Sequence, residues 1–146
     1  MDKSQQRNKG HWEHFPHEAD MGIRGIGPTL EEALAQAAVA LTAVITDPDK
    51  VLPKETVTIT AADPDPELLF VDFLNAVIFE MADRRMLFGE FHVVLDDGRL
   101  TAAARGEAVD VERHQPAVEV KGATYTGLAV KRLEDGSWLA QCIVDV

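Results

Sequence analysis

The stretch that decides the fold lies at residues 29–45, which read TLEEALAQAAVALTAVI. Thr29 can cap the first free N–H groups of a helix while Glu32, three residues on, reaches back to it, and this pair forms a capping box. Apolar side chains then recur at helical spacing, at Leu30, Ala33, Leu34, Ala37, Leu41 and Val44. This spacing predicts an amphipathic helix with one buried face.

A second helix is expected after the DPDP run at residues 63–66. Pro66 suits the first turn of a helix, and Asp65 can cap it. Residues 68–83 are apolar over a broad face, so this helix should lie deep in the protein. Between the two helices, a Pro-containing link leads into residues 55–61, where apolar side chains alternate with threonines as in a half-buried strand.

Strands are predicted wherever apolar and polar residues alternate. Two pairs of strands flank Asp-Gly dipeptides at residues 97–98 and 135–136, which are typical of tight hairpin turns. Shorter strands are expected at residues 11–16, 23–26 and 118–121. Two helices and about seven strands, largely antiparallel, predict an α+β domain in which the helices cover the sheet layers.

The chain has 146 residues, of which 46% are hydrophobic, enough for one domain with one ordinary core. We assign that domain to residues 11–146 and expect the polar residues 1–10 to form a disordered segment. No apolar run approaches the ~20 residues that a membrane-spanning helix needs. The N-terminus has no apolar core of the signal-peptide kind, and Cys142 is the single cysteine, so the composition favours a soluble, cytoplasmic protein without a cysteine-based zinc site.

Acidic residues outnumber basic ones by 25 to 14, which gives a formal net charge of −11. Such a surface repels phosphate backbones, so direct nucleic acid binding is not expected. The same charge suits a basic protein partner or a bound cation. An acidic surface that serves solubility alone is the alternative interpretation.

The usual catalytic and phosphate-binding signatures are missing from the sequence, so no catalytic residue is predicted. The run GIRGIG at residues 22–27 has the look of a phosphate loop, but it precedes rather than follows a strong buried strand. His11, His14 and His17 recur at a spacing of three, and on a helix they could share one face and bind a transition metal. Pro16 argues against a helix there, because the residue before a proline avoids the helical region.

Two aspartates are candidate ligands of a hard cation. Asp20 lies in a polar break between two short strands, where an aspartate also commonly bonds the backbone two residues on. Asp145 is the second-last residue and ends the β-prone segment WLAQCIVDV. There the side-chain carboxylate and the terminal carboxylate can both supply oxygens within one residue, which is the donor density that a hard cation needs. A solvated terminal carboxylate is the alternative.

Several separated blocks of the sequence resemble the archease family. Residues 15–23, FPHEADMGI, resemble its HTADVGI segment, and residues 29–33, TLEEA, resemble its TLEEAF helix start. Residues 69–75, LFVDFLN, resemble its LLxxWLNELL helix. Further blocks resemble its ERH, EVKAVTYH and F-D-V segments, at residues 113–114, 119–125 and 143–146. The blocks keep the family order, and the clearest departure is Thr126, where the family usually has histidine.

The resemblance implies an α+β fold and a metal site made from Asp20, Asp145 and the terminal carboxylate of Val146. Ca²⁺ is the expected ion, or else Mg²⁺ or Mn²⁺, because these donors are hard oxygens. The resemblance also implies an activity, since archeases help a GTP-dependent tRNA-splicing RNA ligase become guanylylated and turn over repeatedly. The chemistry then belongs to the ligase, and this chain is its accessory protein rather than an enzyme.

Four further residues are candidate contacts to that ligase or its nucleotide, namely His17, Lys121, Arg113 and His114. For Lys121, a solvated lysine on a strand is the alternative. Two other functions stay open, which are a chaperone or specificity modulator of an RNA-modifying enzyme, and a metal-dependent phosphoesterase. The phosphoesterase is disfavoured because two-metal hydrolases normally gather several histidines and carboxylates.

Overall fold

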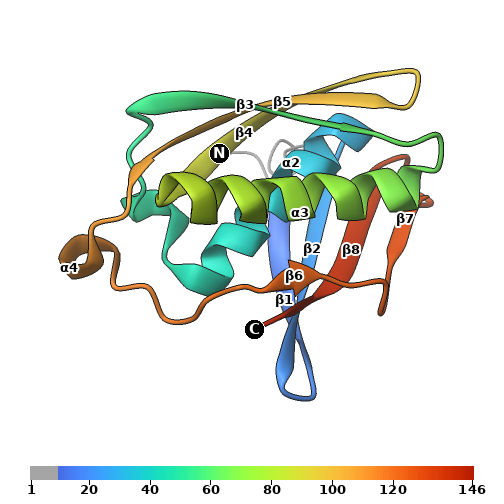
Figure 1. The fold of residues 1–146 in the computed structure, drawn as a ribbon. Helices are drawn as coiled ribbons and strands as arrows, with labels where there is room; N and C mark the ends of the chain where they lie inside the picture. Colours follow the sequence, from blue (N-terminus) through green and yellow to red (C-terminus); the bar gives the residue numbers. More distant parts are fainter. Residues whose placement is uncertain (1–9) are drawn as a thin grey trace, which may run out of the picture.

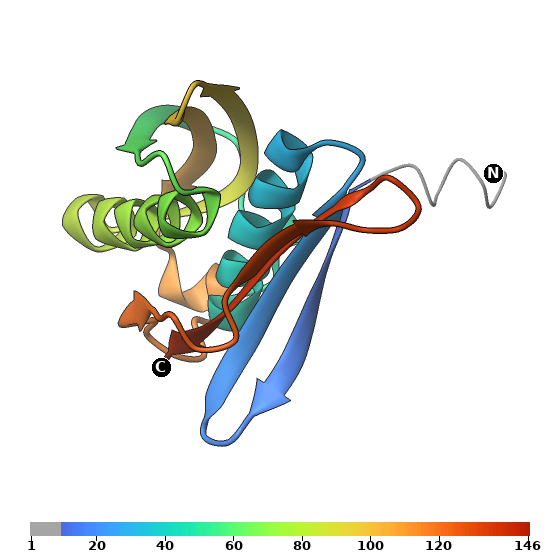
Figure 2. The same ribbon diagram turned by 90° about the vertical axis from the view of Figure 1, so that its right-hand side faces the viewer.

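The computed structural model describes residues 10–146, which form an α+β domain with two antiparallel sheets (Figures 1 and 2). The larger sheet has the strand order β1-β2-β8-β6, and β7 also pairs with β8. Its strands are β1 (His11–His17), β2 (Asp20–Gly27), β6 (Gly122–Ala123), β7 (Ala129–Arg132) and β8 (Trp138–Asp145). The smaller sheet has the order β3-β5-β4, with β3 at Glu55–Ala62, β4 at Met86–Asp96 and β5 at Arg99–Ala108.

The first long helix, α2 (Leu30–Ile45), lies between the two sheets (Figure 2). Thr29 caps it as predicted, because the Thr29 hydroxyl accepts the backbone N–H of Glu32 at 3.2 Å. The helix sits close against β2 at Gly25, where an added Cβ would lie 2.1 Å from the carbonyl oxygen of Ala33. Gly27 likewise lies against α2, at Glu32, whereas Gly22 lies against the ring of Phe15 on β1.

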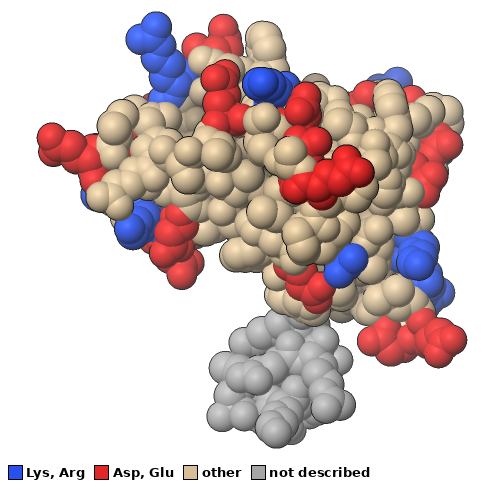
Figure 3. Space-filling view, turned by 90° about the horizontal axis from the view of Figure 1, so that it is seen from below, with Lys and Arg blue, Asp and Glu red and all other residues tan. Residues whose placement is uncertain are grey.

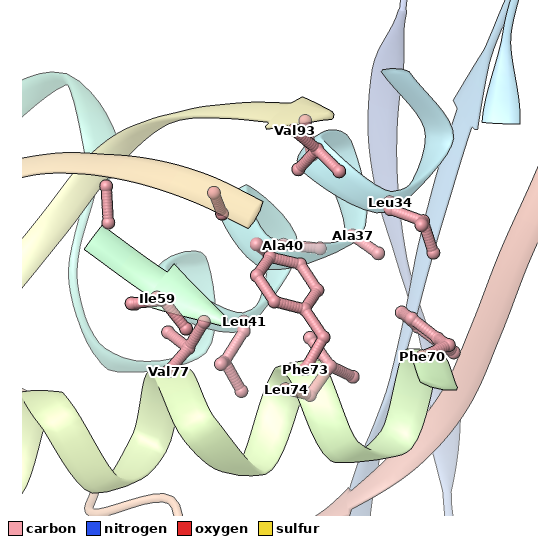
Figure 4. Packing of buried hydrophobic residues seen from close by; sticks show 14 of the residues in the cluster. Leu34, Ala37, Ala40, Leu41, Ile59, Phe70, Phe73, Leu74, Val77 and Val93 are labelled. Carbon is pink, nitrogen blue, oxygen red and sulfur yellow. The ribbon is translucent and has the colours of Figure 1, made fainter. Parts of the chain in front are cut away.

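The second long helix, α3 (Pro66–Arg84), packs against the smaller sheet and beside α2. Asp65 caps it as predicted, because its carboxylate accepts the backbone N–H groups of Glu67 and Leu68. Figure 4 shows Phe73 pointing from α3 toward Ala40 of α2. The buried apolar side chains of both helices and both sheets form one core.

The two predicted Asp-Gly turns are confirmed, since Gly98 and Gly136 have φ angles of 76° and 89°, the region that favours glycine. The predicted strand at residues 118–121 is wrong, because only the two residues of β6 join the ladder in this region. Residues 115–121 instead cross the end of α2, where the Ala117 N–H bonds the carbonyl of Ile45 at 2.8 Å.

The described part of the chain has eight strands and two short helical elements, η1 (Pro48–Lys50) and α4 (Val111–His114), in addition to the two long helices. The first two strands are longer than expected, and only residues 18–19 separate them. Within residues 10–146 no helix has the length and apolar character needed to cross a membrane. The predicted disordered segment, residues 1–10, lies outside the described residues except for Gly10.

Candidate functional site

The two candidate aspartates meet at one end of the larger sheet. Met21 of β2 pairs with Val144 of β8, so the antiparallel register carries Asp20 to the end of the chain. The backbone N–H of Val146 donates to the Asp20 carboxylate at 3.4 Å. Residues 126 positions apart in the sequence thereby become neighbours.

His17 and Lys121 join this end of the sheet. His17 lies opposite Asp20 across the β1–β2 hairpin. The backbone N–H of Lys121 donates to the carbonyl oxygen of Asp145 at 2.8 Å, and its side chain is exposed. We call these five residues, which are His17, Asp20, Lys121, Asp145 and Val146, the carboxylate end of the sheet. In Figure 1 it lies at the foot of the molecule, beside the mark for the C-terminus and the blue hairpin.

The donors at the carboxylate end fit a hard divalent cation. Asp20, Asp145 and the α-carboxylate of Val146 offer oxygens alone, which suit Ca²⁺, Mg²⁺ or Mn²⁺. At 3.4 Å the hydrogen bond to Asp20 is weak, and it leaves the lone pairs of that carboxylate available. The neighbouring thiol of Cys142 is buried, and burial raises its pKa to about 12, so it offers no thiolate to a zinc ion.

The candidate metal donors at the carboxylate end are few. Among residues 10–146, no group of three or more His, Cys, Asp or Glu side chains is arranged to hold a metal ion. The carboxylate end has two such side chains, Asp20 and Asp145, and the α-carboxylate of Val146 is the third candidate donor. These residues can hold a cation and a basic group of a partner, but they include no nucleophile with an adjacent general base.

Arg113 and His114 lie elsewhere, on α4, where they bind Glu107 of β5. Glu107 is 3% exposed, and its carboxylate has four partners. They are the guanidinium of Arg113 at 2.6 Å, the Leu52 N–H at 2.8 Å, His114 Nε2 at 3.0 Å and Lys54 Nζ at 3.6 Å. Arg113 above all, helped by the Leu52 N–H and His114, lowers the pKa of Glu107 to about 2.

The tautomer of His114 follows from its two contacts. The backbone N–H of Asp110 donates to Nδ1 at 2.8 Å, so Nδ1 is unprotonated and Nε2 carries the proton that is donated to Glu107. His114 is buried, and its hydrogen bonds hold α4 against β5. Of this pair only Arg113 reaches the surface, and its guanidinium also donates to the carbonyl of Lys50 at 2.6 Å.

Sequence patterns do not mark Glu107. Alternation along β5 assigns it to the outer face of the sheet, because Ala102 and Ala104 point inward. It is buried because α4 and the link after η1 fold over it, and both are irregular in sequence.

The three histidines near the N-terminus do not form a metal site. They lie on a strand, so His14 points to the opposite face from His11 and His17. His11 contacts Glu13 at 3.0 Å, and the ring of His14 contacts the carbonyl oxygen of Ala40 at 2.8 Å.

Comparisons with known proteins agree on one family. The family model described as "Archease protein family (MTH1598/TM1083)" matches residues 12–146. "Protein archease" of Pyrococcus furiosus is 40% identical over 139 residues, which cover 92% of this chain and 98% of that protein. "Protein archease" of Methanopyrus kandleri is also 40% identical, and the match covers 92% of this chain and 99% of that protein.

Solved structures show the same fold. The solution structure of Methanobacterium thermoautotrophicum protein 1598 has a TM-score of 0.76 and 30% identity, and covers 92% of this chain and 98% of that one. A Thermotoga maritima protein, described as an archease and possible chaperone, has a TM-score of 0.59 and covers 90% of this chain and 94% of that one. Its identity is 19%, so it bears on the fold alone.

Proposed function

The chain belongs to the archease family, and from this premise we propose that it is a metal-binding accessory protein that activates a GTP-dependent tRNA-splicing RNA ligase. In this proposal the ligase performs the chemistry, and the chain promotes its guanylylation and its repeated turnover. The carboxylate end of the sheet is the working part of the molecule.

One observation carries the proposal, which is that the chain end and Asp20 come together from residues 126 positions apart. The β2–β8 register and the β6–β8 pairing hold the two acidic segments in place, so the donors do not depend on a mobile loop. A divalent ion bound there would supply positive charge next to phosphate oxygens of the partner's nucleotide. Lys121 adds a second positive group at the same place.

The exposed position of this site favours an accessory role. Asp145 and Lys121 are exposed at the foot of the molecule, next to a hairpin that projects beyond the body (Figure 2). A projecting, hard-donor site can enter the active site of a second protein, whereas an independent hydrolase needs an enclosed pocket with more ligands. The metal-dependent phosphoesterase lacks a matching cluster of metal ligands among the described residues. A ligation assay distinguishes the other alternative, a chaperone or specificity modulator of an RNA-modifying enzyme.

A multiple-turnover ligation assay tests the proposal. Purified ligase, GTP and RNA are combined with a substoichiometric amount of the chain, with its Asp20→Asn and Asp145→Asn variants, or with Asp96→Asn. Asp96 is exposed on the distant smaller sheet, so its variant is the matched control for the loss of one negative charge. We expect wild type and Asp96→Asn to accelerate ligation, and the other two variants to lose at least about tenfold of that stimulation.

The same assay separates the alternatives. A wild-type chain that leaves ligation and guanylylation unchanged would refute the proposal. Phosphate ester hydrolysis by the chain alone would establish the phosphoesterase, and protection of the ligase from aggregation without faster turnover would establish the chaperone.

A further inference from the structure

An apolar groove lies between the second half of α3 and residues 116–120. It encloses about 210 Å³. Its walls include Ile45 at the end of α2, Ile78, Met81 and Ala82 of α3, and Val109 and Val118. In Figure 1 the chain segment that forms its outer wall runs below α3 from α4 to β6.

We propose that this groove is the socket for one large apolar side chain of the partner enzyme, presented next to a basic residue. The proposal rests on the proposed function, because it takes the partner to be the ligase that the carboxylate end serves. It adds a docking contact that is separate from the metal donors.

The size of the groove favours a single side chain. An apolar cavity of about 150 Å³ is large enough to bind benzene, so 210 Å³ accommodates an aromatic ring or a branched aliphatic side chain. Sites for cofactors or other drug-sized molecules usually measure about 300–1,000 Å³. Interfaces gain most of their affinity from a few such anchors in fitted pockets.

The charges around the groove specify the neighbour of that side chain. Glu119 is the single charged residue in the wall, and it is exposed. The chain as a whole carries a formal charge of −11. Seen from below, the middle of the surface carries few charged side chains, and both acidic and basic ones stand around it (Figure 3). An apolar anchor flanked by a lysine or arginine matches this pattern, because the basic group can pair with Glu119 at the rim.

One wall of the groove leads along the chain to the carboxylate end of the sheet. Residues 116–120 lead directly to Lys121, whose N–H bonds the carbonyl oxygen of Asp145 at 2.8 Å. The segment is held by the hydrogen bond of the Ala117 N–H and by the buried side chain of Val120. Val118, at the rim, is 41% exposed. A partner that reaches the metal donors can therefore also contact the groove, and both contacts can form in one docking event.

Two pairs of variants test the socket. Val118→Asp places a charge in the groove, and its control Val94→Asp makes the same change at a residue that is 51% exposed on the other sheet. Glu119→Lys reverses the rim charge, and Glu134→Lys makes the same reversal in the exposed β7–β8 turn. Affinity for the purified ligase and affinity for Ca²⁺ are both measured by calorimetry on the full chain.

We expect Val118→Asp and Glu119→Lys each to weaken ligase binding by about tenfold or more, as truncation of an anchoring contact does. Their Ca²⁺ affinity, and the ligase affinity of the two controls, should equal the wild type. If the wild type binds the ligase and all four variants bind equally well, the socket is refuted while the proposed function stands. If the wild type binds no ligase, the proposed function itself fails. If the wild type forms dimers and Val118→Asp is monomeric, the groove binds a second copy of the chain. That result would overturn the proposal.

Discussion

At the scale of single residues, the strongest electrostatic feature is Glu107 on β5. Its buried carboxylate links α4, through Arg113 and His114, to the link after η1, through Leu52. A buried charge is stable only when it is paired and hydrogen-bonded, and this one has four partners. Segments that have little regular structure of their own are thereby held against the smaller sheet.

Replacing this carboxylate tests its contribution. We expect Glu107→Gln to lower the free energy of unfolding by on the order of 2 kcal/mol at neutral pH, since hydrogen bonds to a charged group are the stronger kind. Chemical denaturation of both proteins measures the difference. Glu112→Gln, at an exposed position of α4, is the control and should leave the stability unchanged.

The difference between wild type and Glu107→Gln should depend on pH. The folded protein lowers the pKa of Glu107 to about 2 from the ordinary 4.5, so the charge stabilises the fold fully above pH 4.5. This stabilisation is lost as the pH falls from about 4.5 towards about 2, because both states then bind the proton. A gap that stays constant over this range would contradict the assignment.

At the scale of elements, β8 is the strand that assembles the candidate site. It pairs with β2 on one side and with both β6 and β7 on the other, and it ends at Asp145. The strand therefore brings Val146 to Asp20 through backbone pairing and the Val146 N–H, neither of which depends on the charge of the chain end. The stability of the fold and the binding of metal should be separable at this position.

A short Gly-Ser extension after Val146 separates them. It moves the terminal carboxylate away while the Val146 N–H and side chain stay in place, so we expect metal affinity to fall about tenfold or more, as it does when a metal site loses a supporting group. The melting temperature in metal-free buffer should be unchanged, because exposed termini contribute little to a core. With excess metal only the unextended chain should gain melting temperature by mass action.

Ligase activation is the second quantity to measure on the extended chain. Ligase activation at limiting metal should fall in parallel with metal affinity. If the extended chain activates the ligase as well as the native one, the α-carboxylate is not a ligand, and Asp145 acts through its side chain alone.

At the scale of the whole molecule, net charge governs which partners can approach. A formal charge of −11 repels the phosphate backbone, because acidic residues outnumber basic ones by 25 to 14. We expect the chain alone to bind tRNA negligibly at physiological salt. A filter-binding titration at several salt concentrations measures this, with the ligase as positive control. Tight binding that weakens steeply with salt, as counterion release requires, would contradict the expectation.

The local features of the fold could be read from the sequence. Thr29 and Asp65 cap the long helices where predicted, and Gly98 and Gly136 make the hairpin turns. Caps, turns and the period of apolar side chains depend on residues a few positions apart, so a linear sequence contains them in full. The family also followed from blocks of the sequence, and the candidate ligands Asp20, Asp145 and Val146 came with that resemblance.

Only the tertiary structure decided which distant residues meet. It placed Lys121 and His17 beside the two aspartates, and it paired the other two candidate contacts, Arg113 and His114, with the buried carboxylate of Glu107. It also replaced the strand expected at residues 118–121 by a segment that crosses the end of α2. These outcomes depend on contacts between separate elements, and the residues in contact lie up to 126 positions apart in the sequence. The physical reason is that such contacts form only when burial of the common core brings the elements together, and no local pattern records that burial.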